Sequence, residues 1–292
     1  MRRYKIGQVS RMLNVPVETI RFLEQKGLVF PEKDADSGYR FYDIWDVNQI
    51  LDYQKYRQIG FSSSETVSLV RNGSLEYLIE LLAEKEREAE YLSRFYEAKA
   101  VKLRNYQIVL RNARDMLGKY LILNCPENYS LFLRSIDSEG LHVSSAGEME
   151  DSYEELTKYY PFTEHIYRIK REWLESPKHA HNAQWGMTMK KRWVDALGVR
   201  LLPSMEHLKS TTALFTVIPV GERQFFTADL LSGAFDFMQE NGYELNGNIT
   251  GTYLATVREQ AVRYMEVWIP VRTEERASDS TEGFHDLRAV FG

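Results

Sequence analysis

Residues 4–42 read YKIGQVSRMLNVPVETIRFLEQKGLVFPEKDADSGYRFY, and two helical patterns follow one another within them. Apolar side chains recur at helical spacing over residues 4–13, Asn14-Val15-Pro16 interrupts them, and a second helical pattern continues to Gly27, a natural stop. Two short helices joined by a tight turn predict a helix-turn-helix, whose second helix lies in the major groove of DNA. We expect its solvent side to present Glu18, Thr19, Arg21, Phe22 and Gln25.

The rest of the first seventy residues predicts a wing and two more helices. Extended runs at 28–31 and 39–42 are separated by turn residues, which is typical of a hairpin. A third helix is expected to end at Gly60, and Ser62 and Glu65 have the spacing of a capping box for a fourth. The inward residues expected on the third helix are Val47, Ile50 and Leu51.

A heptad pattern begins at Leu75. The a and d positions of residues 75–117 are apolar or aromatic at 11 of 13 sites, the exceptions being Lys85 and Lys99. Over about six heptads this pattern predicts a coiled coil, because such a helix cannot bury its apolar seam alone. The alternative is a helix packed lengthwise against the C-terminal part of its own chain.

The pattern changes after Pro126, where extended and helical segments alternate. This mixture predicts an α+β domain and is compatible with a repeated strand–helix–strand–strand unit. Strands are expected at 131–136, 183–190, 211–219, 224–228, 252–257 and 264–271, with helix inside 153–174 and over 230–241.

Composition narrows the class of protein. Of 292 residues, 43% are hydrophobic and 27% charged, as in globular chains, and neither a membrane-length apolar run nor a signal-type stretch is found. With its single cysteine, the chain is expected to be cytoplasmic, without membrane contact. Residues 1–75 hold 11 basic and 9 acidic side chains, and residues 121–292 hold 17 and 25. The net charge of −5 therefore belongs to the C-terminal half and does not exclude DNA binding.

Five motifs follow one another in the N-terminal part: Tyr4-x-Ile6-Gly7-x-Val9-Ser10, Thr19-Ile20-Arg21-Phe22, Gly27-Leu28-x-x-Pro31, Gly38-Tyr39-Arg40-x-Tyr42 and Gly60-Phe61-Ser62. Their order over residues 4–71 resembles the DNA-binding domain of MerR-type transcription regulators. The resemblance implies a homodimer on a near-palindromic promoter, which activates by distorting the promoter spacer for RNA polymerase. The DNA-binding residues that it suggests, together with the groove-facing positions, are Glu18, Thr19, Arg21, Phe22, Tyr39, Arg40 and Arg57.

Two positions depart from that family. Pro16 stands where the family has a serine N-cap, and Phe22-Leu23 stands where it has two tyrosines. Two hydroxyls that would bond phosphate are therefore missing. Because phosphate contacts position a protein without reading bases, we expect weaker binding rather than a different preferred operator.

Three motifs mark the C-terminal half: Ile218-Pro219-x-Gly221, Gly251-Thr252-Tyr253 and residues 265–271, MEVWIPV. They resemble the GyrI-like effector-binding domain of multidrug-sensing MerR regulators. The expected fold is therefore α+β, with a winged helix-turn-helix at 1–73, an antiparallel coiled-coil dimerisation helix at 74–119, a GyrI-like domain at 120–273 and a tail at 274–292.

The last expected strand suggests where an effector binds. Tyr264, Glu266 and Trp268 alternate with aliphatic residues, so that one face carries a carboxylate between two aromatic rings. Such a face suits an organic cation. The alternative is a solvent-facing strand whose glutamate forms a salt bridge.

The resemblance to multidrug sensors adds further effector positions. Tyr153 and Trp185 align with ring-stacking aromatics of those regulators, and Tyr253 lies in a shared motif. Leu254 stands where those regulators carry a cation-binding glutamate, which favours a neutral or anionic aromatic effector. Four tryptophans make an aromatic-lined pocket possible: Trp173, Trp185, Trp193 and Trp268.

These observations predict a ligand-responsive, sequence-specific DNA-binding transcription regulator with a small aromatic or cationic effector. Neither a catalytic motif nor a cofactor fingerprint is found. Cys125, His179 and His181 have too few metal-ligating residues near them in the sequence for a metal site. We therefore expect no enzyme activity, cofactor or metal. Two alternatives stay open: a hydrolase in which Glu266 is the general base, and a constitutive DNA-binding scaffold.

Overall fold

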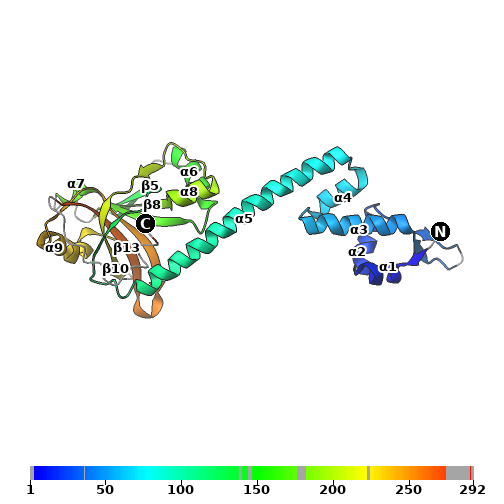
Figure 1. The fold of residues 1–292 in the computed structure, drawn as a ribbon, viewed down its shortest axis with the longest axis horizontal. Helices are drawn as coiled ribbons and strands as arrows, with labels where there is room; N and C mark the ends of the chain where they lie inside the picture. Colours follow the sequence, from blue (N-terminus) through cyan, green and yellow to red (C-terminus); the bar gives the residue numbers. More distant parts are fainter. Residues whose placement is uncertain are drawn as a thin grey trace. The chain divides into compact units, whose positions relative to one another are not determined.

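The computed structural model describes residues 3–35, 37–137, 140–143, 147–175, 182–221, 224–273 and 290. The chain divides into two compact units, Met1–Leu92 and Ser93–Gly292, each of which is described by itself (Figure 1). None of the helices in these described ranges is long and apolar enough to cross a membrane.

The first unit is a helical head with a small sheet. Its strands β1, β3 and β2 pair in that order, and its core collects the apolar faces of α1, α2 and α3. The elements are β1 (Tyr4–Lys5), α1 (Ile6–Leu13), α2 (Val17–Gln25), β2 (Glu32–Lys33), β3 (Arg40–Tyr42), α3 (Ile44–Ile59) and α4 (Ser63–Asn72).

The helix boundaries predicted for the head are confirmed where glycine or a capping box sets them. Gly27 and Gly60 adopt φ values of +65° and +108°, which glycine reaches at no steric cost. The Ser62 side chain accepts from the backbone N–H of Glu65, and the Glu65 carboxylate accepts in return from the Ser62 N–H. These contacts satisfy backbone donors that the first turn of α4 leaves open.

Three details of the predicted head were wrong. The first helix begins at Ile6, because Tyr4 and Lys5 pair with β3 instead. The run 28–31 does not form a strand. Its side chains at 28 and 29 are buried in the core, and the wing strand β2 comes after it, at 32–33. Leu51 is 43% exposed, and Tyr53, one helical turn after Ile50, is buried in its place.

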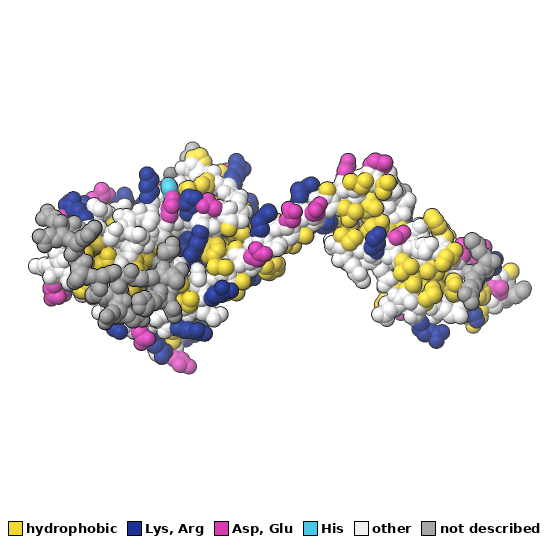
Figure 2. Space-filling model, in the orientation of Figure 1, with side chains coloured by type: hydrophobic (Ala, Val, Ile, Leu, Met, Phe, Trp, Pro, Cys, Tyr) yellow, Lys and Arg dark blue, Asp and Glu magenta, His cyan; other side chains and the backbone are white. Residues whose placement is uncertain are grey.

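The long helix α5 (Leu75–Asn112) ends five residues before the predicted seam does. Several apolar seam positions are exposed, and acidic and basic side chains are interspersed along the helix (Figure 2). Ala98, Val109 and the following Ala113 are instead buried against the C-terminal domain. The helix therefore packs against the C-terminal domain of its own chain with only one side of its C-terminal part. The large exposed seam residues are Leu75, Leu82, Leu92, Tyr96, Leu103, Tyr106 and Leu110, and Leu117 beyond the end of the helix is exposed as well.

The second unit is built on one large sheet of antiparallel strands. The main path of the sheet runs β4-β10-β13-β12-β7-β8-β5-β6, and β9 pairs with β5 and β11 with β13. Its elements up to the middle are β4 (Leu121–Asn124), β5 (Asn128–Asp137), β6 (Gly140–Val143), α6 (Gly147–Thr157), β7 (Thr163–Ile169), α7 (Arg171–Leu174), β8 (Ala183–Lys190) and α8 (Lys191–Leu197). The remainder are β9 (Glu206–Leu208), β10 (Thr212–Gly221), the short 3-10 helix η2 (Ala228–Leu231), α9 (Ser232–Glu240), β11 (Tyr243–Leu245), β12 (Ile249–Val257), η3 (Arg258–Gln260) and β13 (Val262–Thr273).

The strand–helix–strand–strand unit occurs twice, as the sequence suggested. The elements β5-α6-β7-β8 form one copy and β10-α9-β12-β13 the other, and the two copies meet where β12 pairs with β7. Strand β7 was missed by the sequence reasoning, and the strand expected at 224–228 is not formed, since η2 begins at Ala228. Of the expected tail, the structure describes Val290 alone, and its side chain is buried.

Strand β13 has two differently covered faces, in the alternation that was predicted. Met265, Val267 and Ile269 pack with α9 and η2. Tyr264 and Trp268 pack instead with the end of α5, beside which β13 and β10 lie in Figure 1. The alternative of a solvent-facing strand is wrong, because the Glu266 side chain on that second face is 5% exposed.

Candidate DNA-binding surface and effector cavity

The second helix of the helix-turn-helix offers a polar surface. Glu18 and Arg21 are exposed on α2, and Thr19 is partly exposed, while Ile20 and Leu23 are buried beneath them. This is the amphipathic pattern of a helix that packs on one side and reads the major groove with the other.

Phe22, also expected on that surface, packs partly against α3. It is half-buried, with its ring centroid 6.4 Å from that of Tyr53 on α3. The Lys26 ammonium lies 5.6 Å from the same ring. These contacts support the orientation of α2 and leave part of the Phe22 side chain exposed, so its contact with DNA stays a prediction.

The wing strand β3 is tied to α2 by an ion pair that the sequence reasoning missed. The Arg40 Nε donates to the Glu24 carboxylate at 2.8 Å, and the Arg40 side chain remains 45% exposed. Tyr39 is 60% exposed, with the Lys5 ammonium 5.0 Å from its ring centroid. Arg57 is exposed on α3 and donates to the carbonyl of Phe61. A phosphate that binds Arg40 therefore competes with Glu24.

The second unit contains a narrow hollow, partly open to solvent, between α5 and the sheet. Its residues come from α5, from four strands of the two repeated units and from the start of α8. They are Lys102, Asn105, Tyr106, Val109, Glu164, Lys190, Arg192, Thr252, Tyr253, Leu254, Glu266 and Val290.

A β-bulge shapes the sheet side of this cavity. The register of β12 against β13 shifts between Tyr253 and Ala255, which leaves Leu254 as the extra residue. A bulge interrupts the alternation of side chains between the two faces. As a result the consecutive residues Thr252, Tyr253 and Leu254 all line the cavity.

Glu266 is the buried carboxylate of the cavity. Its Oε1 accepts a hydrogen bond from the Thr252 hydroxyl at 2.7 Å and lies 4.0 Å from the Lys190 ammonium. Lys102, from α5, contacts the Glu164 carboxylate on β7. The cavity therefore pairs charges that come from elements far apart in the sequence.

The surroundings of the two cavity lysines lower their pKa values. Burial, and to a smaller degree the neighbouring Lys190 ammonium, lowers the pKa of Lys102 to about 7, although Glu266 favours its charged form. Contact with Glu164 also favours the charged form of Lys102. Burial lowers the pKa of Lys190 as well, against the opposing effect of Glu266.

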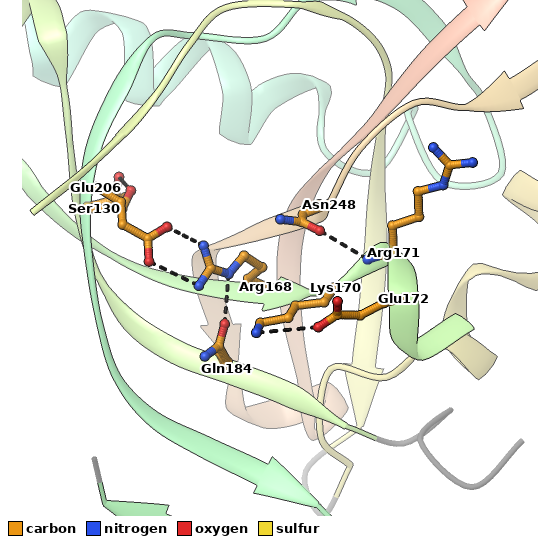
Figure 3. A network of polar contacts seen from close by, with 9 residues as sticks. Ser130, Arg168, Lys170, Arg171, Glu172, Gln184, Glu206 and Asn248 are labelled. Carbon is orange, nitrogen blue, oxygen red and sulfur yellow. Dashed lines mark hydrogen bonds and ion pairs between the residues drawn. The ribbon is translucent and has the colours of Figure 1, made fainter. Parts of the chain in front are cut away.

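A second polar cluster lies on β7 beyond the cavity. Arg168 is 6% exposed, its Nε donates to Gln184 at 2.8 Å, and its other nitrogens contact both oxygens of Glu206 (Figure 3). Its guanidinium lies 3.6 Å from the ring centroid of Phe132. These contacts fasten β9 and β8 to β7, so we interpret the cluster as support for the sheet.

The structure brings together only part of the expected effector set. Tyr253 and Glu266 line the cavity, whereas Tyr264 and Trp268 are buried in the apolar cluster beside it. The Trp268 ring packs on Phe215 at 4.7 Å. Sequence reasoning missed Lys102, Lys190 and Arg192. The signal for the last two was the run of cations Lys190-Lys191-Arg192 that directly follows a strand pattern.

Tyr153 and Trp185 are not among the residues that line the cavity. Tyr153 is 43% exposed on α6. The Trp185 ring stacks on His165, with the ring centroids 5.4 Å apart. Successive side chains of a strand point to opposite faces, so Trp185 lies on the face of β8 opposite to that of Lys190. Trp173 and Trp193 do not line the cavity either, so Tyr106 and Tyr253 are its aromatic walls.

Comparison with known proteins agrees with the head described above. Residues 4–71 match the model of the MerR HTH family of regulatory proteins. Over 117 residues the chain is 31% identical to the HTH-type transcriptional regulator CueR of Escherichia coli O157:H7, covering 37% of this chain and 81% of that protein. The chain belongs to the MerR family of DNA-binding transcription regulators.

Other MerR relatives match over shorter stretches. The HTH-type transcriptional regulator HmrR of Rhizobium leguminosarum bv. viciae is 38% identical over 65 residues, which is 22% of this chain and 50% of that protein. Among solved structures, the cryo-EM structure of an EcmrR–DNA complex is 18% identical with a TM-score of 0.37, and the match covers 92% of this chain and 100% of that one.

Proposed function

We propose that this MerR-family chain is a homodimeric regulator whose residues 120–273 form a GyrI-like domain that binds a small effector. The observation that carries the proposal is the double use of α5. One stretch of the helix supplies Lys102, Asn105 and Tyr106 to the cavity, while Leu103 and Leu110 on another side stay exposed. A ligand in the cavity therefore touches the helix that we expect to form the dimer.

The exposed seam supports the dimer. Apolar side chains repeated every three and four residues along a helix are buried in soluble proteins by a partner helix. An antiparallel pair of α5 helices would place one head at each end, as a two-half-site operator requires. The proposed candidate contacts of each head are Glu18, Thr19 and Arg21 at the bases, and Tyr39, Arg40 and Arg57 at phosphates.

The proposed partners follow from this arrangement. The dimer binds double-stranded promoter DNA, and effector binding shifts it towards a state that distorts the promoter spacer so that RNA polymerase engages both promoter elements. The energy for the distortion comes from additional protein–DNA contacts.

The test is transcription in vitro from the DNA upstream of the chain's own gene, with RNA polymerase and a panel of aromatic anions, cations and neutral molecules. We expect at least one panel member to change transcript yield at constant promoter occupancy. Glu266→Ala and Tyr253→Ala should reduce that response, while Tyr153→Ala serves as a control outside the cavity. Equal transcript yield with every panel member would favour a constitutive DNA-binding scaffold.

Replacing Arg40 by alanine should weaken operator binding across sequences and lower the slope of log affinity against log salt by about one. Removing the competing Glu24 carboxylate, in Glu24→Gln, should raise affinity instead. Mobility shifts over a salt series measure both effects, with the exposed Arg87→Ala on α5 as the charge-matched control. An unchanged slope in Arg40→Ala would remove Arg40 from the phosphate contacts.

A further inference from the structure

The cavity contains more cations than carboxylates. Lys102, Lys190 and Arg192 face two acidic side chains, Glu164 and Glu266, among the described residues that line it. The side chains of both lysines and of both glutamates are 5 to 20% exposed. Charges with so little water around them interact strongly, and the more exposed Arg192 adds one positive charge at the edge of this group.

The two carboxylates are already engaged within the protein. Glu164 contacts Lys102, and Glu266 accepts from Thr252 in addition to its proximity to Lys190. The Arg192 guanidinium donates to the carbonyl of Val290 at 3.0 Å. Within the described part of the chain, no ion pair with a carboxylate is formed by Arg192.

A neighbouring and roomier hollow shares Lys190, Arg192 and Val290 with the cavity. Two of the three cations therefore lie where the two spaces adjoin. Tyr106, Tyr253 and Leu254 give the cavity apolar and aromatic surface. The second hollow also has Glu127, Lys191 and Asp195 on its walls, where Asp195 pairs with Lys191 and Glu127 contacts His207. The cavity thus combines cations with a surface for an apolar or aromatic body.

We infer that the effector is an organic anion, with a carboxylate or similar acidic group directed at Lys190 and Arg192 and an aromatic or branched apolar body against Tyr106, Tyr253 and Leu254. This inference rests on the ligand-sensing part of the proposed function. An anion offsets the excess charge, whereas a cation would add a fourth positive charge to the cluster. Leu254, an apolar residue, contributes no carboxylate to reverse the balance.

The shifted lysines agree with this assignment. Burial lowers the pKa values of Lys102, Lys190 and Arg192, so each cation is less stable in the cavity than in water. A bound carboxylate favours their charged forms. Carboxylate binding is therefore coupled to proton uptake by the lysines, which makes its affinity depend on pH.

The inference is tested by calorimetric titration of the full-length protein with three probes that share one body and differ in charge: 2-naphthoate, 2-naphthylmethanol and 2-naphthylmethylammonium. A panel of smaller and larger matched acids, alcohols and amines accompanies them. We expect the carboxylate of a matched set to bind at least tenfold more tightly than the amine, and to raise the thermal unfolding temperature.

Variants locate the charge preference in the cavity. Arg192→Gln and Lys102→Met should each lower carboxylate affinity about tenfold and leave the affinity of the matched alcohol nearly unchanged. Lys99→Met, one turn earlier on α5 with its ammonium over Tyr96, removes the same charge outside the cavity and should change neither. Arg192 is exposed, so its variant is expected to fold even if Lys102→Met does not.

A pH series gives an independent measurement. Lysine is charged below its pKa, so carboxylate affinity should fall as pH rises through the Lys102 pKa of about 7, and Lys102→Met should flatten this dependence. The other charged or titratable groups that face Lys102 are Glu164 on β7, Lys190 on β8, Arg192 on α8, Tyr253 on β12, Glu266 on β13 and Tyr106 on α5.

The possible outcomes separate the two proposals. Tighter binding of the amine in each matched set would overturn the anionic assignment and leave ligand sensing in place. Carboxylate binding that is insensitive to both Arg192→Gln and Lys102→Met would also overturn it. Binding of no panel member would overturn ligand sensing together with the charge assignment.

Discussion

The double variant Leu92→Glu/Leu103→Glu should be a folded monomer. Its operator affinity should be lower by roughly a hundredfold, because the second head no longer binds at a high effective concentration. Both side chains are exposed, by 41% and 47%, so their replacement leaves the fold of the single chain intact. In the proposed dimer they lie in the apolar seam, where an unpaired carboxylate loses water without a compensating contact.

Sedimentation velocity and mobility shifts on a complete operator measure the two effects of this variant. The matched control is Arg94→Glu with Val101→Glu, which adds at least as much negative charge at exposed positions of the same helix outside the a and d seam. The control should remain dimeric and bind the operator normally. A dimeric Leu92/Leu103 variant would show that α5 does not supply the principal dimer contact.

Lys190→Met should lower the free energy of unfolding of the second unit by about 3 kcal/mol, since it removes the buried cation paired with the Glu266 carboxylate. The two side chains are 11% and 5% exposed, and their charged atoms are 4.0 Å apart. We expect the low end of the range for broken buried pairs, because the Thr252 hydroxyl still donates to Glu266. The double variant Lys190→Met/Glu266→Gln should recover part of the loss.

The adjacent Lys191 provides the control for this measurement. Lys191 pairs with Asp195, and their side chains are 35% and 58% exposed. Lys191→Met should therefore change the free energy of unfolding by less than about 0.5 kcal/mol. Urea unfolding followed by tryptophan fluorescence reports on the second unit, which contains four of the five tryptophans. Equal losses in Lys190→Met and Lys191→Met would argue against a stabilising role for the Glu266 pair.

The head was largely predictable because its signals are local. Gly27, Gly60 and the Ser62–Glu65 capping box act within one helical turn, and each ends or begins a helix as expected. The ion pair of Arg40 with Glu24 was not predictable, since sixteen residues separate the two and only the folded wing brings them together. The burial of Phe22 likewise depends on the position of α3.

The cavity was less predictable because it depends on pairing between distant strands. Alternation along β13 correctly grouped Glu266 with Tyr264 and Trp268, but which side chains line a cavity depends on what packs over them. The bulge at Leu254 has no signal in the sequence pattern, and it directs Tyr253 to the cavity. Lys102 and Glu164, 62 residues apart, meet only when α5 packs on the sheet.

Tyr106 belongs to both the predicted seam and the cavity, and its hydroxyl donates to the carbonyl of Leu254. If a second chain packs on Tyr106 and an effector contacts its ring, the association of two chains and the uptake of effector are thermodynamically linked. Linkage is reciprocal, so an effector that strengthens the dimer binds the dimer more tightly by the same factor. The apparent effector affinity then varies with protein concentration, and the cellular copy number of the regulator becomes one of the variables that set its sensitivity.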